Sequence, residues 1–172
     1  MLESPETLSL LQSIIDRSAA TAGSAIRRNF IGGGWCMSAA EFVSFWAPGR
    51  MASISTVSAS GDVHAVPLDP RLFDGKFYIQ TFPDSQRLRD LRIHPRCAIT
   101  SWDGPYRAVI VYGIGRQIDR DPTGRTAETA AEQRYPMGSI ISVEVTPTRI
   151  YAIRPPAGRE ATRPRAAASR TS

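Results

Sequence analysis

The sequence predicts a mainly β protein: a closed or nearly closed antiparallel barrel of about seven strands, with helices at the N-terminus and one short helix embedded among the strands. Two observations carry this prediction. From Met51 onward the apolar residues change from a helical period to strict alternation. Turn signals such as Asp74-Gly75 and Asp103-Gly104 then separate the alternating segments at short intervals. A barrel leaves no unpaired strand edges, while a β-sandwich remains the alternative.

The N-terminal region is predicted to be helical. Residues 7–29 carry apolar side chains at helical spacing, which predicts one amphipathic helix. Glycines 32–34 are predicted to be a linker, because no Lys-Ser or Lys-Thr pair follows them to complete a phosphate loop. Ser38 and Glu41 form a capping-box signature that starts a second, short helix ending near Trp46.

The strands are expected to form a meander. Alternation over 51–57 places Ala52, Ile54 and Thr56 on one face. A glycine-containing bulge is expected in the long strand over 106–118. Further elements are a brief helical stretch over 121–135 and two last strands that Pro147 separates. The other predicted strands span 63–68, 72–73, 77–79, 97–102, 139–145 and 148–153.

The embedded helix, over 83–93, carries the clearest candidate site. Ser85 is placed as its N-cap, so the amide N–H groups of Gln86 and Arg87 point beyond the helix start. A cation such as Arg87 in the first turn is unfavourable unless an anion offsets it, and Thr81 adds a hydroxyl nearby. The pattern indicates a bound phosphate; a solvated arginine beside an ordinary cap is the alternative.

The net charge of +5 does not indicate a nucleic-acid-binding protein. Five arginines against Glu160 give the segment from Arg154 onward a charge of +4, which leaves +1 for the rest. That segment is too poor in large apolar residues to fold by itself, and the nearly neutral body offers no basic face. Nucleic acid is therefore not an expected partner.

Composition excludes other classes. No apolar run approaches the roughly 20 residues of a membrane span, and the start of the chain lacks the pattern of a secretory signal, so a cytoplasmic location is expected. Cys36 and Cys97 are far apart, and His64 and His94 are the only histidines, so neither a zinc site nor a disulfide framework is predicted.

Five short motifs, in this order and spacing, resemble the pyridoxamine 5'-phosphate oxidase-like flavin-binding split barrels. The resemblance covers roughly residues 38–153. It implies a homodimer that holds two cofactors at the subunit interface. The motifs are Gly49 to Val57, Gly61 to Pro67, Thr81 to Leu91, Pro95 to Cys97, and Gly113 to Arg116.

The resemblance also implies cofactor contacts for particular residues. The first strand would lie along the flavin ring with Ser53, Ile54 and Ser55, and the next strand would offer the backbone groups of Val66 and Pro67. The start of the embedded helix would hold the phosphate through Thr81, Ser85, Gln86 and Arg87. The segment of Arg116 and Gln117 would reach the cofactor of the partner subunit. The family often has lysine in place of Arg87.

The predicted function is an oxidoreductase that uses FMN, or alternatively the deazaflavin F420, to pass hydride to or from an unidentified small molecule. Synthesis of pyridoxal phosphate is not expected, because the C-terminus lacks the Arg-Leu ending of the true oxidases. No catalytic residue is assigned; His64 on a strand is more typical of a structural histidine. The alternatives are a non-catalytic barrel that binds flavin or haem as a carrier or sensor, and a nucleic-acid-binding barrel.

The predicted organisation has three parts. Residues 1–35 form the N-terminal helix and glycine linker. Residues 36–154 form the flavin-binding split-barrel domain, and residues 155–172 form a basic tail without a fold of its own.

Overall fold

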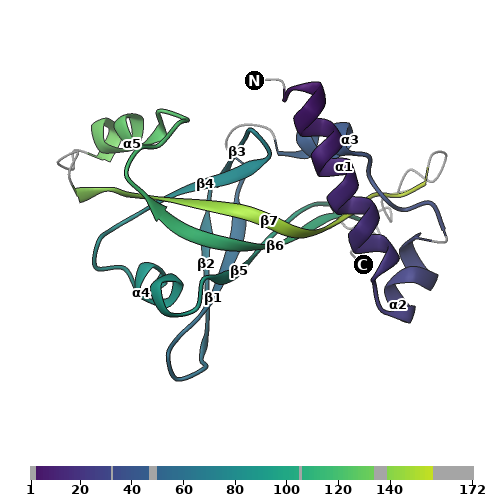
Figure 1. Ribbon diagram of the computed structural model, residues 1–172, viewed down its shortest axis with the longest axis horizontal. Helices are drawn as coiled ribbons and strands as arrows, with labels where there is room; N and C mark the ends of the chain where they lie inside the picture. The colour runs from purple at the N-terminus through teal and green to yellow at the C-terminus, as the bar shows by residue number, and fades with distance from the viewer. Residues whose placement is uncertain (1–2, 32, 47–49, 105, 134–138, 157–172) are drawn as a thin grey trace, which may run out of the picture.

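The computed structural model describes residues 3–31, 33–46, 50–104, 106–133 and 139–156. Its strands form one antiparallel sheet in the order β2-β1-β5-β6-β7-β4-β3, which curls into a half-barrel (Figure 1). The mainly β, split-barrel prediction is confirmed, and the β-sandwich alternative is wrong because the strands share a single sheet. The strands are β1 (Ala52–Val57), β2 (Val63–Leu68), β3 (Arg71–Phe73), β4 (Lys76–Thr81), β5 (Arg96–Asp103), β6 (Arg107–Ile118) and β7 (Ile141–Ile153).

The predicted N-terminal helix is interrupted. Helix α1 (Pro5–Ala20) is followed by α2 (Ser24–Ile26) and a π-helical turn (Arg27–Ile31), so the prediction of one helix over 7–29 is wrong. The hydroxyl of Thr21, the C-cap residue, donates to the carbonyl of Arg17, and Gly23 takes an extended conformation. Local hydrogen bonds therefore end a helix that the apolar spacing alone would have continued.

The other helices begin at side-chain caps. Helix α3 (Ala39–Phe45) has the predicted capping box between Ser38 and Glu41, and α4 (Gln86–Ile93) is the predicted embedded helix with Ser85 as its N-cap. Helix α5 (Arg125–Gln133) begins later than expected. The Asp121 carboxylate accepts from the amides of Thr123 and Thr126, which holds this stretch as a turn; residues 134 and 135 of the predicted helix lie outside the described residues.

The last strand is continuous, so the prediction of two strands separated by Pro147 is wrong. The β6–β7 register shifts by one residue, from Tyr112 opposite Arg149 to Gly113 opposite Pro147. This leaves Thr148 as the extra residue of a β-bulge. A bulge tolerates proline because the ladder is already interrupted there.

Helices α1 and α3 cover part of the inner face of the sheet (Figure 1). Leu11 of α1 and Phe42 of α3 are wholly buried in one hydrophobic cluster with Phe77 of β4 and Val109 of β6. In β1 the buried residues are Ala52, Ile54 and Thr56, on the face that alternation predicted.

Two predictions concern parts of the chain outside the described residues. They are the tail from 157 onward and Gly32 of the glycine linker. Among the helices that the structure describes, none has the length and apolar character needed to cross a membrane.

Candidate functional site

The start of α4 brings Thr81, Ser85 and Arg87 into contact, as the sequence predicted. The Thr81 and Ser85 hydroxyl oxygens lie 2.7 Å apart. The Ser85 hydroxyl accepts from the Leu88 amide at 3.2 Å, which caps the helix. Arg87 Nη2 donates to Thr81 Oγ1 at 2.8 Å. Strand β4 therefore ends in a hydroxyl that fixes the guanidinium of the first helical turn.

Arg87 has unused capacity to bind an anion. Its Nε is buried and has no hydrogen-bond partner, and among the described residues no carboxylate pairs with its guanidinium. Burial lowers the pKa of Arg87 below its ordinary value. Partial burial of a guanidinium that has no counter-ion costs solvation free energy, so an anion at this position would stabilise it.

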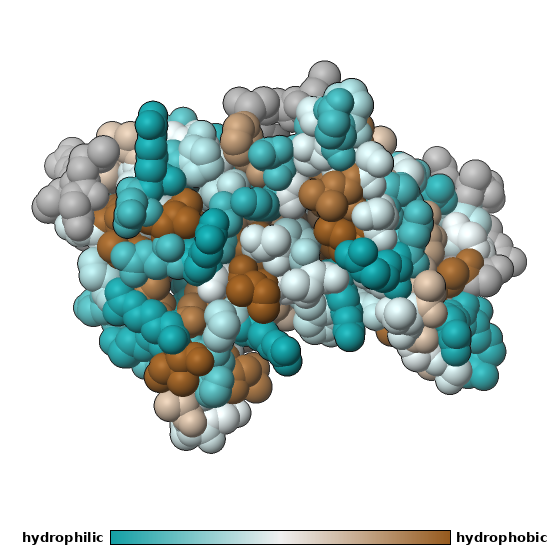
Figure 2. All heavy atoms as spheres, viewed as in Figure 1, coloured by the Kyte–Doolittle hydropathy of each residue, from teal (hydrophilic) through white to brown (hydrophobic). Residues whose placement is uncertain are grey.

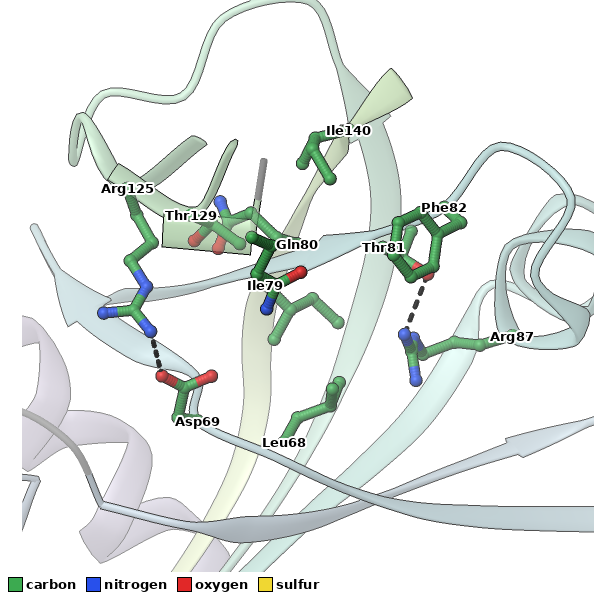
Figure 3. A pocket seen from close by; sticks show the side chains of 11 residues that line it. Leu68, Asp69, Ile79, Gln80, Thr81, Phe82, Arg87, Arg125, Thr129 and Ile140 are labelled. Atoms are coloured by element: carbon green, nitrogen blue, oxygen red, sulfur yellow. Dashed lines mark hydrogen bonds and ion pairs between the residues drawn. The ribbon is translucent and has the colours of Figure 1, made fainter. Parts of the chain in front are cut away.

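Arg87 lines a cavity of about 170 Å³ (Figure 3). This is more than ten times the roughly 10–15 Å³ that one water requires. Strands β2 and β4, helix α4 and helix α5 contribute to its walls. The lining residues are Leu68, Asp69, Ile79, Gln80, Thr81, Phe82, Arg87, Arg125, Thr129, Gln133 and Ile140.

The wall that α5 contributes was missed by the sequence predictions. Arg125 Nη2 pairs with Asp69 Oδ2, and this pair lies on the opposite side of the cavity from Arg87 and Thr81 (Figure 3). Thr129 is nine-tenths buried, and its hydroxyl has no partner. No local pattern in the α5 sequence indicated this role, because only the folding of the chain brings α5 to the cavity.

Strands β1 and β2 carry the residues expected along the flavin ring. Ser53 pairs with Pro67 and Ile54 with Val66, and Leu68, next to Pro67, lines the cavity. The Ile54 side chain is buried in the core. Its backbone lies in register with both neighbouring strands, opposite Val66 of β2 and Ile99 of β5.

The Gln86 side chain points to a different cluster. Its Nε2 donates to Asp90 Oδ1 at 2.7 Å, and its Oε1 accepts from Arg89. The backbone N–H of Gln86 is thus the group that this residue contributes at the helix start.

Arg116 and Gln117 are not brought to this cavity within one chain. Arg116 pairs with Glu144 at 3.0 Å and its side chain is 68% exposed, while Gln117 accepts from Arg92 at 2.9 Å. Both lie on β6, which β7 separates from β4 in the sheet.

Glu144 is the centre of a polar cluster on the same face as Arg116. It accepts from Lys76 Nζ and from the Tyr78 hydroxyl, each at 3.1 Å. Burial would raise the pKa of Glu144, but the hydrogen bonds and positive charges of Lys76 and Arg116 outweigh it and lower the pKa. Burial, reinforced by Glu144, raises the pKa of Tyr78 to about 12, so the phenol stays protonated.

A second buried carboxylate, Asp90, joins α4 to the β1–β2 hairpin. It accepts from Thr56 Oγ1 at 2.7 Å and lies 2.8 Å from His64 Nδ1. Burial would raise the pKa of Asp90, but the hydrogen bonds from His64, Thr56 and Gln86 together lower it. His64 therefore serves as a hydrogen-bonding partner of a buried carboxylate that holds α4 against the β1–β2 hairpin.

The two cysteines and the remaining acids form no metal site among the residues that the structure describes. Cys97 is buried, which raises its pKa to about 11. Its thiol therefore stays protonated and unreactive near neutral pH.

The outer face of the sheet carries several exposed apolar side chains beside the polar cluster of Glu144. The register places Ser55, Ala98 and Tyr112 in one row and puts Trp102, 65% exposed, farther along the same face. Apolar side chains also reach the surface where the β1–β2 hairpin and α4 lie (Figure 2), with Val63 69% exposed. Exposed apolar residues gathered on neighbouring strands are typical of an interface.

Solved structures share this fold. A conserved hypothetical protein from Mycobacterium tuberculosis is 20% identical, with a TM-score of 0.60 over 70% of this chain and 86% of that chain. An F420 reductase is 20% identical, with a TM-score of 0.53 over 62% and 93%. The haem storage protein HutZ of Vibrio cholerae is 11% identical, with a TM-score of 0.53 over 66% and 92%.

No curated protein matches the chain in sequence. The family model described as pyridoxamine 5'-phosphate oxidase matches residues 38–158. This segment contains all seven strands of the sheet and the helix α4 that bears Arg87. The chain belongs to the pyridoxamine 5'-phosphate oxidase family.

Proposed function

We propose that the protein is a flavin-dependent oxidoreductase that binds FMN with its phosphate at the start of α4. The observation that carries this proposal is the buried Nε of Arg87, which lacks a partner at the wall of a cavity. The Ser85 cap and the Thr81 hydroxyl lie beside it. A phosphate offers acceptor oxygens to all of these donors.

The residues present fit a phosphorylated flavin. Thr81, Arg87 and the backbone N–H groups of Gln86 and Arg87 would hold the phosphate, and the β1–β2 hairpin would offer backbone groups to the ring. When bound, the flavin supplies hydride transfer. The protein side chains would bind, orient and shield it from water, which agrees with the absence of a predicted catalytic acid or base.

The cofactor F420 is the second candidate, because it also carries a phosphate beyond a flavin-like ring. An F420 reductase shares the fold at 20% identity. The α4 site by itself suits either phosphate.

We also propose that the functional form is a homodimer, as is typical of this family. The exposed ring of Tyr112, in one row with the short side chains of Ser55 and Ala98, could pack against a second copy. A second copy would supply the groups that one chain leaves away from its own cavity. We assign this role to Arg116, which Glu144 holds at the surface.

The decisive experiment identifies the small molecule that co-purifies with the protein, by absorption spectrum and mass after heat release. FMN is the expected result. Reduction by a nicotinamide donor, followed by transfer to an acceptor over many turnovers, would establish an enzyme.

Release of haem would contradict the proposal and support a carrier, a function named for one structure of similar fold. A bound flavin that no donor reduces would likewise indicate a carrier. Apo-protein that takes up neither FMN nor F420 would contradict flavin binding altogether.

A further inference from the structure

We propose that helix α5 is a lid over the cavity, whose second half, residues 128–133, opens in the free protein and closes when a ligand fills the cavity. Thr129 and Gln133 of this half line the cavity. The opening goes beyond the proposed function, because it is a property of the free protein. Closure by FMN rests on the proposed function.

The start of α5 is fixed to the rest of the protein. The Asp121 carboxylate accepts from the Thr126 amide at 3.1 Å. The hydroxyl oxygens of Thr126 and Ser142, which lies on β7, are 2.7 Å apart. Arg125 pairs with Asp69, just beyond the end of β2. These contacts hold the first turn of the helix in place, so it serves as the pivot of the lid.

The second half of α5 is held more weakly. Glu128 pairs with Arg71 of β3 at 3.6 Å, and the two side chains are 53% and 35% exposed. An exposed ion pair of this kind contributes little to stability. The buried residues of this half are Thr129 and Ala130, and residues 131–133 are exposed. One alanine and one exposed ion pair are therefore the main contacts that favour closure.

Closure also has a cost, which falls on Thr129. Its hydroxyl is buried and makes no hydrogen bond within the part of the chain that the structure describes. Figure 3 shows Thr129 across the cavity from Arg87. A buried polar group without a partner raises the free energy of the state that contains it. Opening the lid exposes this hydroxyl to water, so the free protein gains solvation when α5 is released.

Release of α5 should also unfold it. The helix has nine residues, and helices this short are not stable in water without tertiary contacts. A segment with few buried apolar contacts opens at a much lower free energy than the whole protein. Amide hydrogen exchange measures such an opening.

The test follows hydrogen exchange of the full-length apo-protein by mass spectrometry. Relative to the rates of an unfolded chain, the amides of residues 128–133 should exchange roughly 100-fold or more faster than those at the centre of β6. Addition of FMN should slow the exchange of residues 128–133, because a filled cavity favours the closed lid.

Two variants change the balance in opposite directions. Thr129→Val removes the unsatisfied hydroxyl and should slow exchange of residues 128–133 by about fivefold or more. Its control, Ala131→Val, places valine at an exposed position of the same half and should not slow exchange. Glu128→Gln removes the ion pair with Arg71 and should speed exchange by about two- to fivefold. Its control is Glu132→Gln, at an exposed position one turn further along the helix.

The outcomes separate the lid from the proposed function. The lid would be overturned if residues 128–133 of the apo-protein exchanged as slowly as β6, or if Thr129→Val left their exchange unchanged. Binding of FMN with no change in their exchange would also overturn it. An apo-protein that binds no FMN would contradict the proposed function, while the exchange of the free variants would still decide whether α5 opens.

Discussion

The guanidinium of Arg87 donates to the hydroxyl of Thr81 across 2.8 Å, yet the Nε of the same side chain is buried without a partner. One end of the group is thus fixed by the strand that precedes the helix, and the other remains free for a ligand. A side chain held in place before its ligand arrives loses little conformational entropy on binding.

Replacing Arg87 should therefore weaken cofactor binding without unfolding the protein. Arg87→Ala should cost roughly 1.5–3 kcal/mol of FMN binding, the scale of a hydrogen bond to a charged group, which is about a 10- to 150-fold higher Kd. Arg87→Glu should be worse, because it places an anion against the phosphate. Fluorescence titration of the apo-protein measures both.

Arg89→Ala is the control for net charge on the same helix. Arg89 is exposed and bonds to Gln86 and to the backbone of Asp84. Unchanged FMN affinity in a folded Arg87→Glu protein would place the phosphate elsewhere.

The stability of the protein should depend on the ionisation of Asp90. Its pKa is lowered in the folded state, so the unfolded chain takes up a proton first as the pH falls. This contribution to the free energy of unfolding is complete above the ordinary aspartate pKa of 3.8 and is lost as the pH drops through the folded pKa. Urea denaturation at a series of pH values from neutral to acidic measures the loss.

Asp90→Asn should flatten this pH dependence and cost about 1–3 kcal/mol near neutral pH, because an amide cannot accept from all three donors. Glu144, whose pKa is also lowered, should account for part of the remaining slope. An Asp90→Asn protein with the wild-type slope would show that Asp90 does not carry the effect.

The glycines of β6 should differ in their tolerance of a methyl group. A Cβ at position 113 would lie 2.6 Å from Val145 Cγ1 and 2.8 Å from the backbone oxygen of Thr146, whereas one at 115 would lie 3.0 Å from Leu91 Cδ2. Backbone cannot move aside as a leucine side chain can. Gly113→Ala should therefore lower the free energy of unfolding by about 3 kcal/mol and Gly115→Ala by about 1 kcal/mol. Urea denaturation measures both changes. Equal losses in the two variants would contradict this explanation.

A charge on the outer face of the sheet should dissociate the proposed dimer. Ala98 lies between Ser55 and Tyr112 in the register, and Ala98→Glu would bury an unpaired carboxylate there. Dimer affinity should fall by roughly 100-fold or more, with a parallel loss of FMN binding. Light scattering measures the mass of the particle in solution. The control is Leu10→Glu, which places the same charge at an exposed position of α1. An Ala98→Glu protein that remains dimeric would show that this face is not the interface.

The sequence by itself determined the elements whose causes are local. Ser38 and Ser85 cap helices through contacts three residues away, and Asp74-Gly75 makes a hairpin with both residues at positive φ. The contact of Arg87 with Thr81 spans six positions. The arrangement of Thr81, Ser85 and Arg87 at the start of α4 was predictable for this reason.

Only the tertiary structure decided the features that depend on residues distant in the chain. The bulge opposite Gly113 allows β7 to continue through Pro147, and the pairing of Asp69 with Arg125 brings α5 to the cavity. His64 finds its role only where Asp90 meets it. The sequence carries no local mark of such contacts, because their free energy arises when burial and strand register bring the partners together.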